Sequence, residues 1–268
     1  MQKDEVNLYT LGSRGSLPVC GEEYREFGGA TTCFLLKKDK YALIVDCGTG
    51  LYKAKELLAD CQKIDIVLTH MHYDHVLGLL KPDVFPKNIQ LNFYSTFKNW
   101  YENNSFNDFL TKPYWPTHFM CNHILHDVGD TNNEVLLNGE FKAKFVPSNH
   151  PDNSNVIILE CANHKIAFMF DFEHRSFSRF NYEELKNCDI ILYDGMYDNE
   201  DYYMHSGWGH STYEEGCSLA KMVNADYLII THHSPECNDE KLLSKERKAK
   251  CLFSNTHFAR CGDILKLK

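Results

Sequence analysis

The chain has 268 residues, 43% of them hydrophobic, which is enough apolar material for one large globular domain or two small ones. Its formal net charge of −9 argues against a protein that grips long nucleic acid through a broad lysine and arginine surface, although a small anion held by metal cations is compatible with it. No stretch approaches the roughly 20 apolar residues of a membrane span, so we expect no membrane partner.

Cysteine usage indicates a reducing environment. The 11 cysteines are an odd number, stand singly along the chain and include no C-x-x-C pair. Such a pattern fits buried thiols better than a disulfide framework. The first residues, MQKDEVNLYT, show no apolar segment typical of a signal peptide. We therefore expect a cytoplasmic protein.

Short runs with the length and composition of β-strands recur along the chain. In order, the predicted strands cover 7–11, 31–36, 41–46, 64–69, 141–146, 155–160, 165–171, 189–194 and 226–231. Helices are predicted at 51–61, 211–224 and 239–253, and the second opens on Ser211 with Glu214 three residues later, as in a capping box. Strand pairs mixed with helices predict an α/β fold in which helices cover buried sheets.

One domain covering 1–268 is the better interpretation, because no repeat or low-complexity linker divides the chain. The region 81–130 is rich in proline, asparagine and aromatic residues and predicts an irregular insertion. Within it, the segment 92–117 could cover a pocket or pair with a second copy of the chain.

The segment LTHMHYDHVLGL, residues 68–79, places three histidines and an aspartate within six positions at the end of an apolar strand. A single histidine is more often an ordinary core or surface residue, but this cluster favours metal ligands. His70 and His72 leave the strand two residues apart and can converge on one ion. Asp74 and His75 follow where a helix should begin and can reach a second ion, while Gly78 lets that helix pack closely.

Further ligands follow other predicted strands. His150 stands just beyond one strand, Asp171 ends another, and His232 and His233 follow the last. These residues are expected at the carboxyl edge of the sheets, where α/β proteins place their sites. The two oxygens of Asp171 can bridge two ions, while position alone leaves His232 and His233 as alternatives.

With these residues in place, the chain resembles the metallo-β-lactamase fold superfamily over nearly its whole length. The segment LIVDCGTG, residues 43–50, matches the strand–Asp–x–Gly element of that superfamily. The resemblance implies an αββα sandwich of two mixed sheets flanked by helices, with two divalent ions, Zn²⁺ first and Mn²⁺ or Fe²⁺ as alternatives. The implied ligands are His70, His72 and His150 for one ion, Asp74, His75 and His232 for the other, and Asp171 as the bridge. His72 and the pair His150 and Asp171 favour hydrolysis over redox chemistry.

Two segments narrow the branch of the superfamily. Residues 207–235 resemble tRNA 3′-processing endonucleases and their phosphodiesterase relatives, which implies that His210 is a general acid; the alternative is a helix-capping histidine. Residues 11–36 and 193–211 are more similar to the cyclic-nucleotide phosphodiesterases, a branch that includes phage anti-defence enzymes. The resemblance therefore implies two-metal hydrolysis of 3′,5′-cyclic nucleoside monophosphates to linear monophosphates. The alternatives are a tRNA-processing endonuclease, a hydrolase of another small cyclic phosphate or ester, and a metal-binding regulator.

The remaining roles follow from these hypotheses. Asp74 and His210 are the expected catalytic residues. Asp46 and Asp194, at strand ends, are candidates either for hydrogen bonds that fix histidine tautomers or for turn caps. Candidate substrate contacts are Arg14 and Arg25 for phosphate and Trp208 and Tyr197 for the base. The resemblance also implies a homodimer. No role is assigned to His118, His123, His126, His164, His174, His205 or His257.

Overall fold

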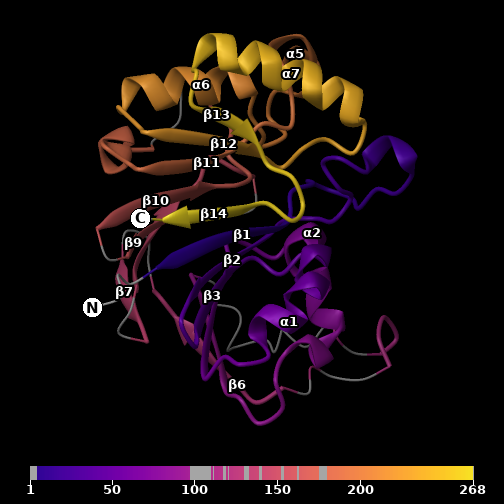
Figure 1. Cartoon of the computed structure of the whole chain (residues 1–268), viewed down its shortest axis with the longest axis vertical. Coiled ribbons are helices and arrows are strands. Elements are labelled where there is room, and N and C mark those ends of the chain that lie inside the picture. Colours follow the sequence, from indigo (N-terminus) through magenta and orange to yellow (C-terminus); the bar gives the residue numbers. More distant parts are fainter. Residues whose placement is uncertain are drawn as a thin grey trace.

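Two mixed β-sheets of seven strands each lie face to face in the computed structural model (Figure 1). The structure describes residues 5–96, 110, 112–116, 119, 121–129, 133–138, 141–151, 154–161, 163–174 and 180–267. Helices lie against the outer faces of both sheets, so the layers run helix, sheet, sheet, helix. This is the αββα architecture expected from the sequence.

The first sheet has the order β14-β1-β2-β3-β4-β5-β6. Its strands are β14 (Ile264–Leu267), β1 (Val6–Gly12), β2 (Cys33–Lys38), β3 (Tyr41–Val45), β4 (Lys63–Val67), β5 (Leu91–Ser95) and β6 (His123–Asp127). Pairing is antiparallel from β14 to β3 and parallel from β3 to β6. The parallel strands bring several carboxyl ends to one edge.

The second sheet repeats this plan in the order β13-β12-β11-β10-β9-β8-β7. Its strands are β13 (Thr256–Phe258), β12 (Tyr227–Thr231), β11 (Ile190–Asp194), β10 (His164–Met169), β9 (Asn155–Cys161), β8 (Phe141–Pro147) and β7 (Glu134–Leu137). Pairing is antiparallel from β7 to β10 and parallel from β10 to β13.

Helices cover the sheets unequally. The α-helices are α1 (Lys55–Leu58), α2 (Tyr73–Val76), α5 (Asn199–His205), α6 (Tyr213–Met222) and α7 (Asp239–Leu252). The 3₁₀ turns are η1 (Glu22–Tyr24), η2 (Thr49–Ala54), η3 (Leu77–Leu80), η4 (Pro82–Val84) and η5 (Tyr182–Leu185). Helices α6 and α7 lie over the second sheet, and the shorter α1 and α2 lie beside the first (Figure 1). Tyr213, Cys217 and Ala220 form the buried face of α6, as the sequence predicts.

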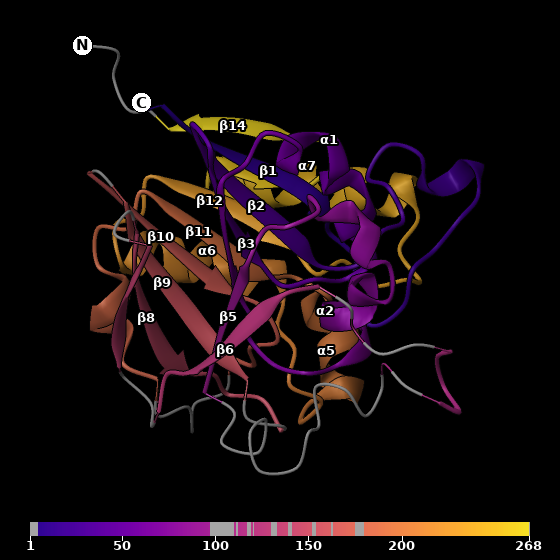
Figure 2. The same ribbon diagram turned by 90° about the horizontal axis from the view of Figure 1, so that it is seen from below.

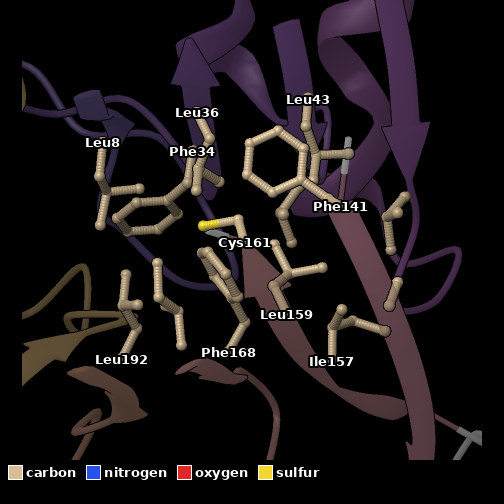
Figure 3. Close-up of a cluster of buried hydrophobic side chains, with 14 of the residues drawn as sticks. Leu8, Phe34, Leu36, Leu43, Phe141, Ile157, Leu159, Cys161, Phe168 and Leu192 are labelled. Atoms are coloured by element: carbon tan, nitrogen blue, oxygen red, sulfur yellow. The ribbon is translucent and has the colours of Figure 1, made fainter. Parts of the chain in front are cut away.

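The two sheets face each other (Figure 2), and a cluster of buried hydrophobic side chains fills the space between them (Figure 3). Phe34 of β2 stacks on Phe170 with ring centroids 5.1 Å apart and also meets Phe168 of β10 edge-on. Leu159 and Ile157 of β9 fill the same layer and are fully buried. Burial of side chains of this size stabilises the fold by about 1.5–3 kcal/mol each, and this keeps the two sheets packed face to face.

Every predicted strand is present, within one or two residues at its ends, and this confirms the strand assignment. The interpretation of 81–130 as irregular is wrong in part, because β5 and β6 lie within it and complete the first sheet. Most of the segment 92–117 lies outside the described residues, so its expected role at the pocket stays a prediction. Strands β7, β13 and β14 were also not predicted; β7 and β14 are short and half-exposed and give little apolar signal, and β13 has only three residues.

Two helix predictions need correction. The segment 51–61 forms most of the 3₁₀ turn η2 followed by a single α-helical turn, α1, rather than one long helix. Helix α6 is capped by Thr212, whose hydroxyl accepts from the Glu215 N–H at 3.2 Å, one residue later than the predicted cap at Ser211. The hydroxyl of Ser211 instead contacts Tyr193 and His174.

All 11 cysteines are free thiols, as their spacing predicts. Within the described part of the chain, no helix has both the length and the apolar character needed to cross a bilayer. A cytoplasmic location stays a prediction.

An ion-pair network joins α7 to β13 and makes a prediction about stability at alkaline pH. The His257 ring donates to Asp263 at 2.7 Å and lies 3.3 Å from Glu246, and these two carboxylates raise its pKa to about 9. The raised pKa stabilises the fold below the unfolded pKa of about 6.5, and this contribution is lost as the pH rises through about 9. We expect His257→Gln to lower the free energy of unfolding by about 1–2 kcal/mol at pH 6, after allowance for solvent screening.

Urea denaturation of both proteins at pH 6 and pH 9.5 measures this difference. The gap between wild type and variant should shrink at the higher pH. A gap that stays constant would show that His257 acts through packing rather than through its charge.

Candidate metal centre and active-site cleft

The site lies where strands of both sheets end. His70 follows β4, and the backbone turns at His72 into α2, which presents Asp74 and His75. Asp171 follows β10, and His232 follows β12. Gly78 allows the close packing that its sequence predicts, because a Cβ there would lie 2.3 Å from the Gly48 carbonyl oxygen.

Three residues that surround the site have left-handed backbone conformations, which are uncommon outside glycine. The φ angles are +58° at Asp46, +49° at Asp171 and +57° at His232. Each stands at the first or second position after a strand, so the chain turns sharply there. These turns aim the side chains into the space between the sheets rather than along the strands.

The first group of possible ligands comprises His70, His72, His150 and Asp171, whose donor atoms all lie within 4.8 Å of one another. Oxygen Oδ2 of Asp171 lies 3.4 Å from His70 Nε2, 4.0 Å from His72 Nδ1 and 3.8 Å from His150 Nε2. Three imidazoles around one carboxylate oxygen form a donor set typical of a divalent transition metal.

The second group comprises Asp74, His75 and His232. The Nε2 atoms of His75 and His232 lie 3.4 Å apart, and both approach Asp74 Oδ2, at 3.3 and 3.2 Å. They also approach the other oxygen of Asp171, Oδ1, at 3.0 and 2.9 Å. Asp171 therefore presents one oxygen to each group, which is the arrangement of a bridging ligand.

These residues fit metal ions. Among the described residues, the buried Nε2 atoms of His70 and His150 lack a hydrogen-bond partner, as expected of ligands that face a cation. Burial, together with nearby His75, lowers the pKa of His70 to about 4, so the ring is neutral and can donate a lone pair. For Asp74, burial opposes ionisation but His75 and His232 outweigh it, and the pKa falls well below its usual value.

Hydrogen bonds fix which nitrogen of each ring faces the site. The Nδ1–H of His75 donates to Asp46 Oδ2 at 2.7 Å, and His150 donates in the same way to the Gly209 carbonyl at 3.1 Å. Thr69 donates to Asp46 and lies 3.1 Å from Nδ1 of His70. Asp46 also accepts from the Thr69 N–H, so it both orients a ligand and caps the turn.

His210 stands at the border of the second group. Its Nδ1 lies 2.9 Å from Asp194 Oδ2, and its ring stacks on His232 with centroids 5.0 Å apart. Burial alone would lower the pKa of His210, but the Asp194 carboxylate raises it above its usual value. Asp194 also accepts from backbone N–H groups of Phe172 and Met196. Like Asp46, it therefore both orients a histidine ring and caps a turn.

An open cleft of about 410 Å³ lies above these groups. Its described lining residues are Ser16, Met71, His72, Tyr73, Asp74, His150, Pro151, Trp208 and His210. Trp208 and Tyr73 are 62% and 65% exposed, which is unusual for large aromatic side chains. The cleft thus joins a polar floor to aromatic walls.

Comparison with known proteins places this geometry in a family. A family model described as "Beta-lactamase superfamily domain" matches residues 41–233. The chain belongs to this superfamily. Its fold is that of the metallo-β-lactamases, and the chain is a metal-dependent hydrolase.

Several similar proteins cover nearly the whole chain. "Probable metallo-hydrolase YhfI" of Bacillus subtilis (strain 168) is 24% identical over 97% of this chain and 99% of its own length. Its crystal structure aligns with a TM-score of 0.75 and 19% identity, covering 99% of this chain and 100% of that one. A diphosphatase of the PhnP family aligns at 0.69 with 20% identity, covering 98% of each chain. The short form of human tRNase Z aligns at 0.65 with 15% identity, covering 97% and 98%.

The structure separates the two candidate histidines of the superfamily's last ligand position. His232 faces Asp74 and Asp171, whereas the ring of His233 donates to the Ala259 carbonyl at 3.0 Å and stacks on Phe258. Burial and the nearby Arg14 lower the pKa of His233 to about 3. His233 is therefore a neutral core histidine, and the geometry places His232 at the site.

Three of the four candidate substrate contacts are not in the cleft. Arg14 is fully buried, and its guanidinium donates to the carbonyls of Gly28, Ser234 and Cys237. Arg25 is exposed and pairs with Glu22 at 2.7 Å on the η1 turn. Tyr197 is buried, stacking on His205 and meeting the His210 ring edge-on. Arg14 is thus corrected to a structural role, Arg25 lies on the surface outside the described lining of the cleft, and Tyr197 packs behind His210.

Some residues that shape the site were not predicted from the sequence. Ser16, from the glycine-rich segment GSRGS, lines the cleft and donates its N–H to Asp74 Oδ2 at 2.7 Å. Tyr73 was missed although it lies inside the histidine motif. Glu173 and Gly209 gave no signal because their partners are distant in sequence.

Proposed function

We propose that this hydrolase is a phosphodiesterase that opens 3′,5′-cyclic nucleoside monophosphates at a dinuclear site, with Zn²⁺ as the metal. The observation that carries the proposal is the position of Asp171, which presents one carboxylate oxygen to each of two histidine groups beneath an open cleft. Its support includes two structural neighbours that are named a diphosphatase and a tRNase.

The ligand set divides between two ions. His70, His72 and His150 would hold one, Asp74, His75 and His232 the other, and Asp171 would contact both. Two such ions, when bound, supply a water nucleophile at neutral pH and stabilise charge on the phosphate during in-line displacement. Asp46 and Gly209 keep two of the ligand rings in the tautomer that this role requires.

His210 supplies the proton for the leaving oxygen. Asp194 holds the ring by Nδ1 and favours its protonated form, so Nε2 carries the proton that the departing ribose oxygen needs. Proton donation of this kind contributes about 10²–10⁴-fold to the rate. The product is a linear nucleoside monophosphate.

The cleft favours a small substrate. None of its described lining residues is lysine or arginine, and the whole chain carries a net charge of −9. A long RNA would meet repulsion over most of its phosphates, whereas a single cyclic phosphate needs only the metal ions. A volume of about 410 Å³ is also within the range of small-molecule sites.

The exposed aromatic side chains bind the base. Trp208 lines the cleft beside His210 and offers a face for stacking, a contact worth about 1–3 kcal/mol per base. We expect Trp208→Ala to raise KM for cyclic nucleotides about 10-fold while kcat changes little. Steady-state kinetics checks this, with Trp208→Phe as the variant that keeps a ring. An unchanged KM in the alanine variant would remove Trp208 from the substrate site.

Product analysis by mass spectrometry tests the function itself. Zinc-loaded protein is incubated separately with cAMP, cGMP, cCMP, cUMP, a sugar-ring cyclic phosphate and a 3′-extended pre-tRNA, with Asp171→Ala as the inactive control. We expect linear nucleoside monophosphates that are absent with the variant. A trimmed tRNA beside intact cyclic nucleotides would instead identify an RNA-processing enzyme, and cleavage of the sugar phosphate alone would identify another small-ester hydrolase.

Two further expectations belong to this proposal. The zinc content of the purified protein is measured by inductively coupled plasma mass spectrometry, and two equivalents per chain are expected. The homodimer is tested by light scattering after gel filtration, where the 31.1 kDa chain should elute at twice its mass.

A further inference from the structure

Glu173 has a buried carboxylate that the proposed chemistry does not use. The residue is 4% exposed and stands two positions beyond the bridging ligand Asp171. Its Oε1 accepts from the Tyr202 hydroxyl at 2.7 Å and from the Gly207 N–H at 2.7 Å, and its Oε2 accepts from the Gly209 N–H at 3.2 Å. A buried charge is tolerated only when donors surround it, so these contacts form a built site.

All three donors belong to one stretch of chain, from α5 to the residue before His210. Gly207 and Gly209 have φ angles of +94° and +88°, which other residues rarely adopt. A Cβ on Gly209 would lie 2.1 Å from His150 Nδ1. The loop therefore follows a path that only glycine permits, pressed against a metal ligand, and Glu173 secures it there.

The loop 207–210 contacts or carries three groups of the site: the His150 ring, Trp208 and His210. The Gly209 carbonyl accepts from the His150 ring and fixes its tautomer. Trp208, between the two glycines, forms a wall of the cleft, and His210 follows directly. A shift of this loop would disturb a ligand, a substrate contact and the proton donor together.

The backbone of Glu173 is tied to the other side of the same ligand. Its N–H donates to the Asn149 carbonyl at 3.0 Å, and the Asn149 side chain donates back to the Glu173 carbonyl at 2.6 Å. His150 follows Asn149 in the chain. One residue thus holds the turn that carries His150 and the loop that orients its ring.

We propose that Glu173 is a positioning residue that couples the His150 metal position to His210 through the loop 207–210. It touches neither the ligand nitrogens nor the substrate, and it acts by holding the Gly209 carbonyl against His150 and His210 beside Asp194. The effect on His150 follows from the metal site alone, while the effect on proton donation rests on the proposed function.

The variant Glu173→Gln tests this with little change of shape. The glutamine oxygen can still accept from Tyr202 and Gly207, but its amide group would meet the Gly209 N–H, and two donors repel. We expect zinc affinity, measured by competition with a chromogenic chelator, to fall about 10-fold. We expect kcat for the cyclic nucleotide to fall about 10–100-fold, because the loop no longer holds His210 in place.

A substrate whose leaving group needs no proton distinguishes misplacement of His210 from a general loss of structure. Bis(p-nitrophenyl) phosphate releases an anion that needs no proton, so its turnover should fall clearly less than that of the cyclic nucleotide. With zinc saturating, kcat for the cyclic nucleotide in the double variant Glu173→Gln, His210→Gln should be no lower than in His210→Gln alone. Glu200→Gln, an exposed carboxylate on α5, is the matched control and should behave as wild type.

Specific outcomes would overturn the proposal. A folded Glu173→Gln protein with wild-type zinc affinity, or additive losses in the double variant, would leave Glu173 a purely structural residue. Where the glutamine variant does not fold, Tyr202→Phe removes one donor only and should weaken zinc binding about 2–5-fold; unchanged affinity there also refutes the proposal. If the wild type cleaves no cyclic nucleotide, the proposed function fails, while the chelator competition still decides the role of Glu173.

Discussion

Asparagine in place of Asp171 is expected to lower kcat/KM on the order of 10³-fold and to leave less than two equivalents of zinc per chain. Asp171 is the residue whose two carboxylate oxygens face both histidine groups, at 3.4 Å from His70 and 2.9 Å from His232. The amide keeps the shape but presents at most one neutral oxygen, so one group loses its anionic partner. Zinc content and steady-state kinetics on a cyclic nucleotide measure the two effects.

The matched control for Asp171 is Asp226→Asn, an exposed aspartate between α6 and β12. It should keep both zinc equivalents and full activity. Far-ultraviolet circular dichroism confirms that each variant is folded. A folded Asp171→Asn protein that retains two zinc ions and wild-type kcat would refute the bridging role and, with it, the proposed centre.

Glutamine in place of His210 is expected to lower kcat for the cyclic nucleotide about 10²–10⁴-fold while KM stays within a few-fold. The physical reason is that Asp194, 2.9 Å from Nδ1, raises the pKa of His210 and so favours the protonated ring at the border of the cleft. Turnover of bis(p-nitrophenyl) phosphate should fall less than about 10-fold, since p-nitrophenolate leaves without a proton. Rapid-quench kinetics on both substrates measures the difference.

A competing role for His210 is built into the geometry. Its ring also lies within 4.8 Å of donor atoms of Asp171, Asp194 and His232, a set that could hold a cation. Zinc content separates the two roles, because loss of a proton donor leaves the metal in place. A fall to one equivalent in His210→Gln would make it a ligand and refute the general-acid role; His164→Gln, at the opposite end of β10, is the control.

The first four candidate metal ligands were predictable because their pattern is local. His70, His72, Asp74 and His75 occupy six positions at the end of one apolar strand, and such spacing has few other uses. The long apolar runs that form β2, β3, β9, β10, β11 and β12 were equally clear, because burial on both faces requires continuous hydrophobic sequence. His150, Asp171 and His232 then meet at one edge of the second sheet, because β8, β10 and β12 run in the same direction.

The substrate contacts were poorly predicted because the identity of an arginine or tyrosine does not show whether its side chain packs in the core or lines a cleft. Arg14 stands among glycines in GSRGS, as an anion-binding residue would, yet its guanidinium is turned toward three backbone carbonyls. Tyr197 lies near His210 in sequence, but packing places it behind the ring rather than in the cleft. The marginal strands β6 and β14 likewise exist because a neighbouring strand pairs with them.

By short-range spacing and hydrophobic runs, the sequence by itself indicated an α/β fold and a cluster of candidate metal ligands, and its resemblance to the metallo-β-lactamase superfamily implied the αββα class and the hydrolytic chemistry. Only the tertiary structure decided which oxygen of Asp171 faces which group and which loop the Glu173 carboxylate contacts, and it placed His232 rather than His233 at the site, as the resemblance implied. Those facts depend on contacts between residues 21 to 158 positions apart. Long-range packing selects such contacts, and no local pattern records them.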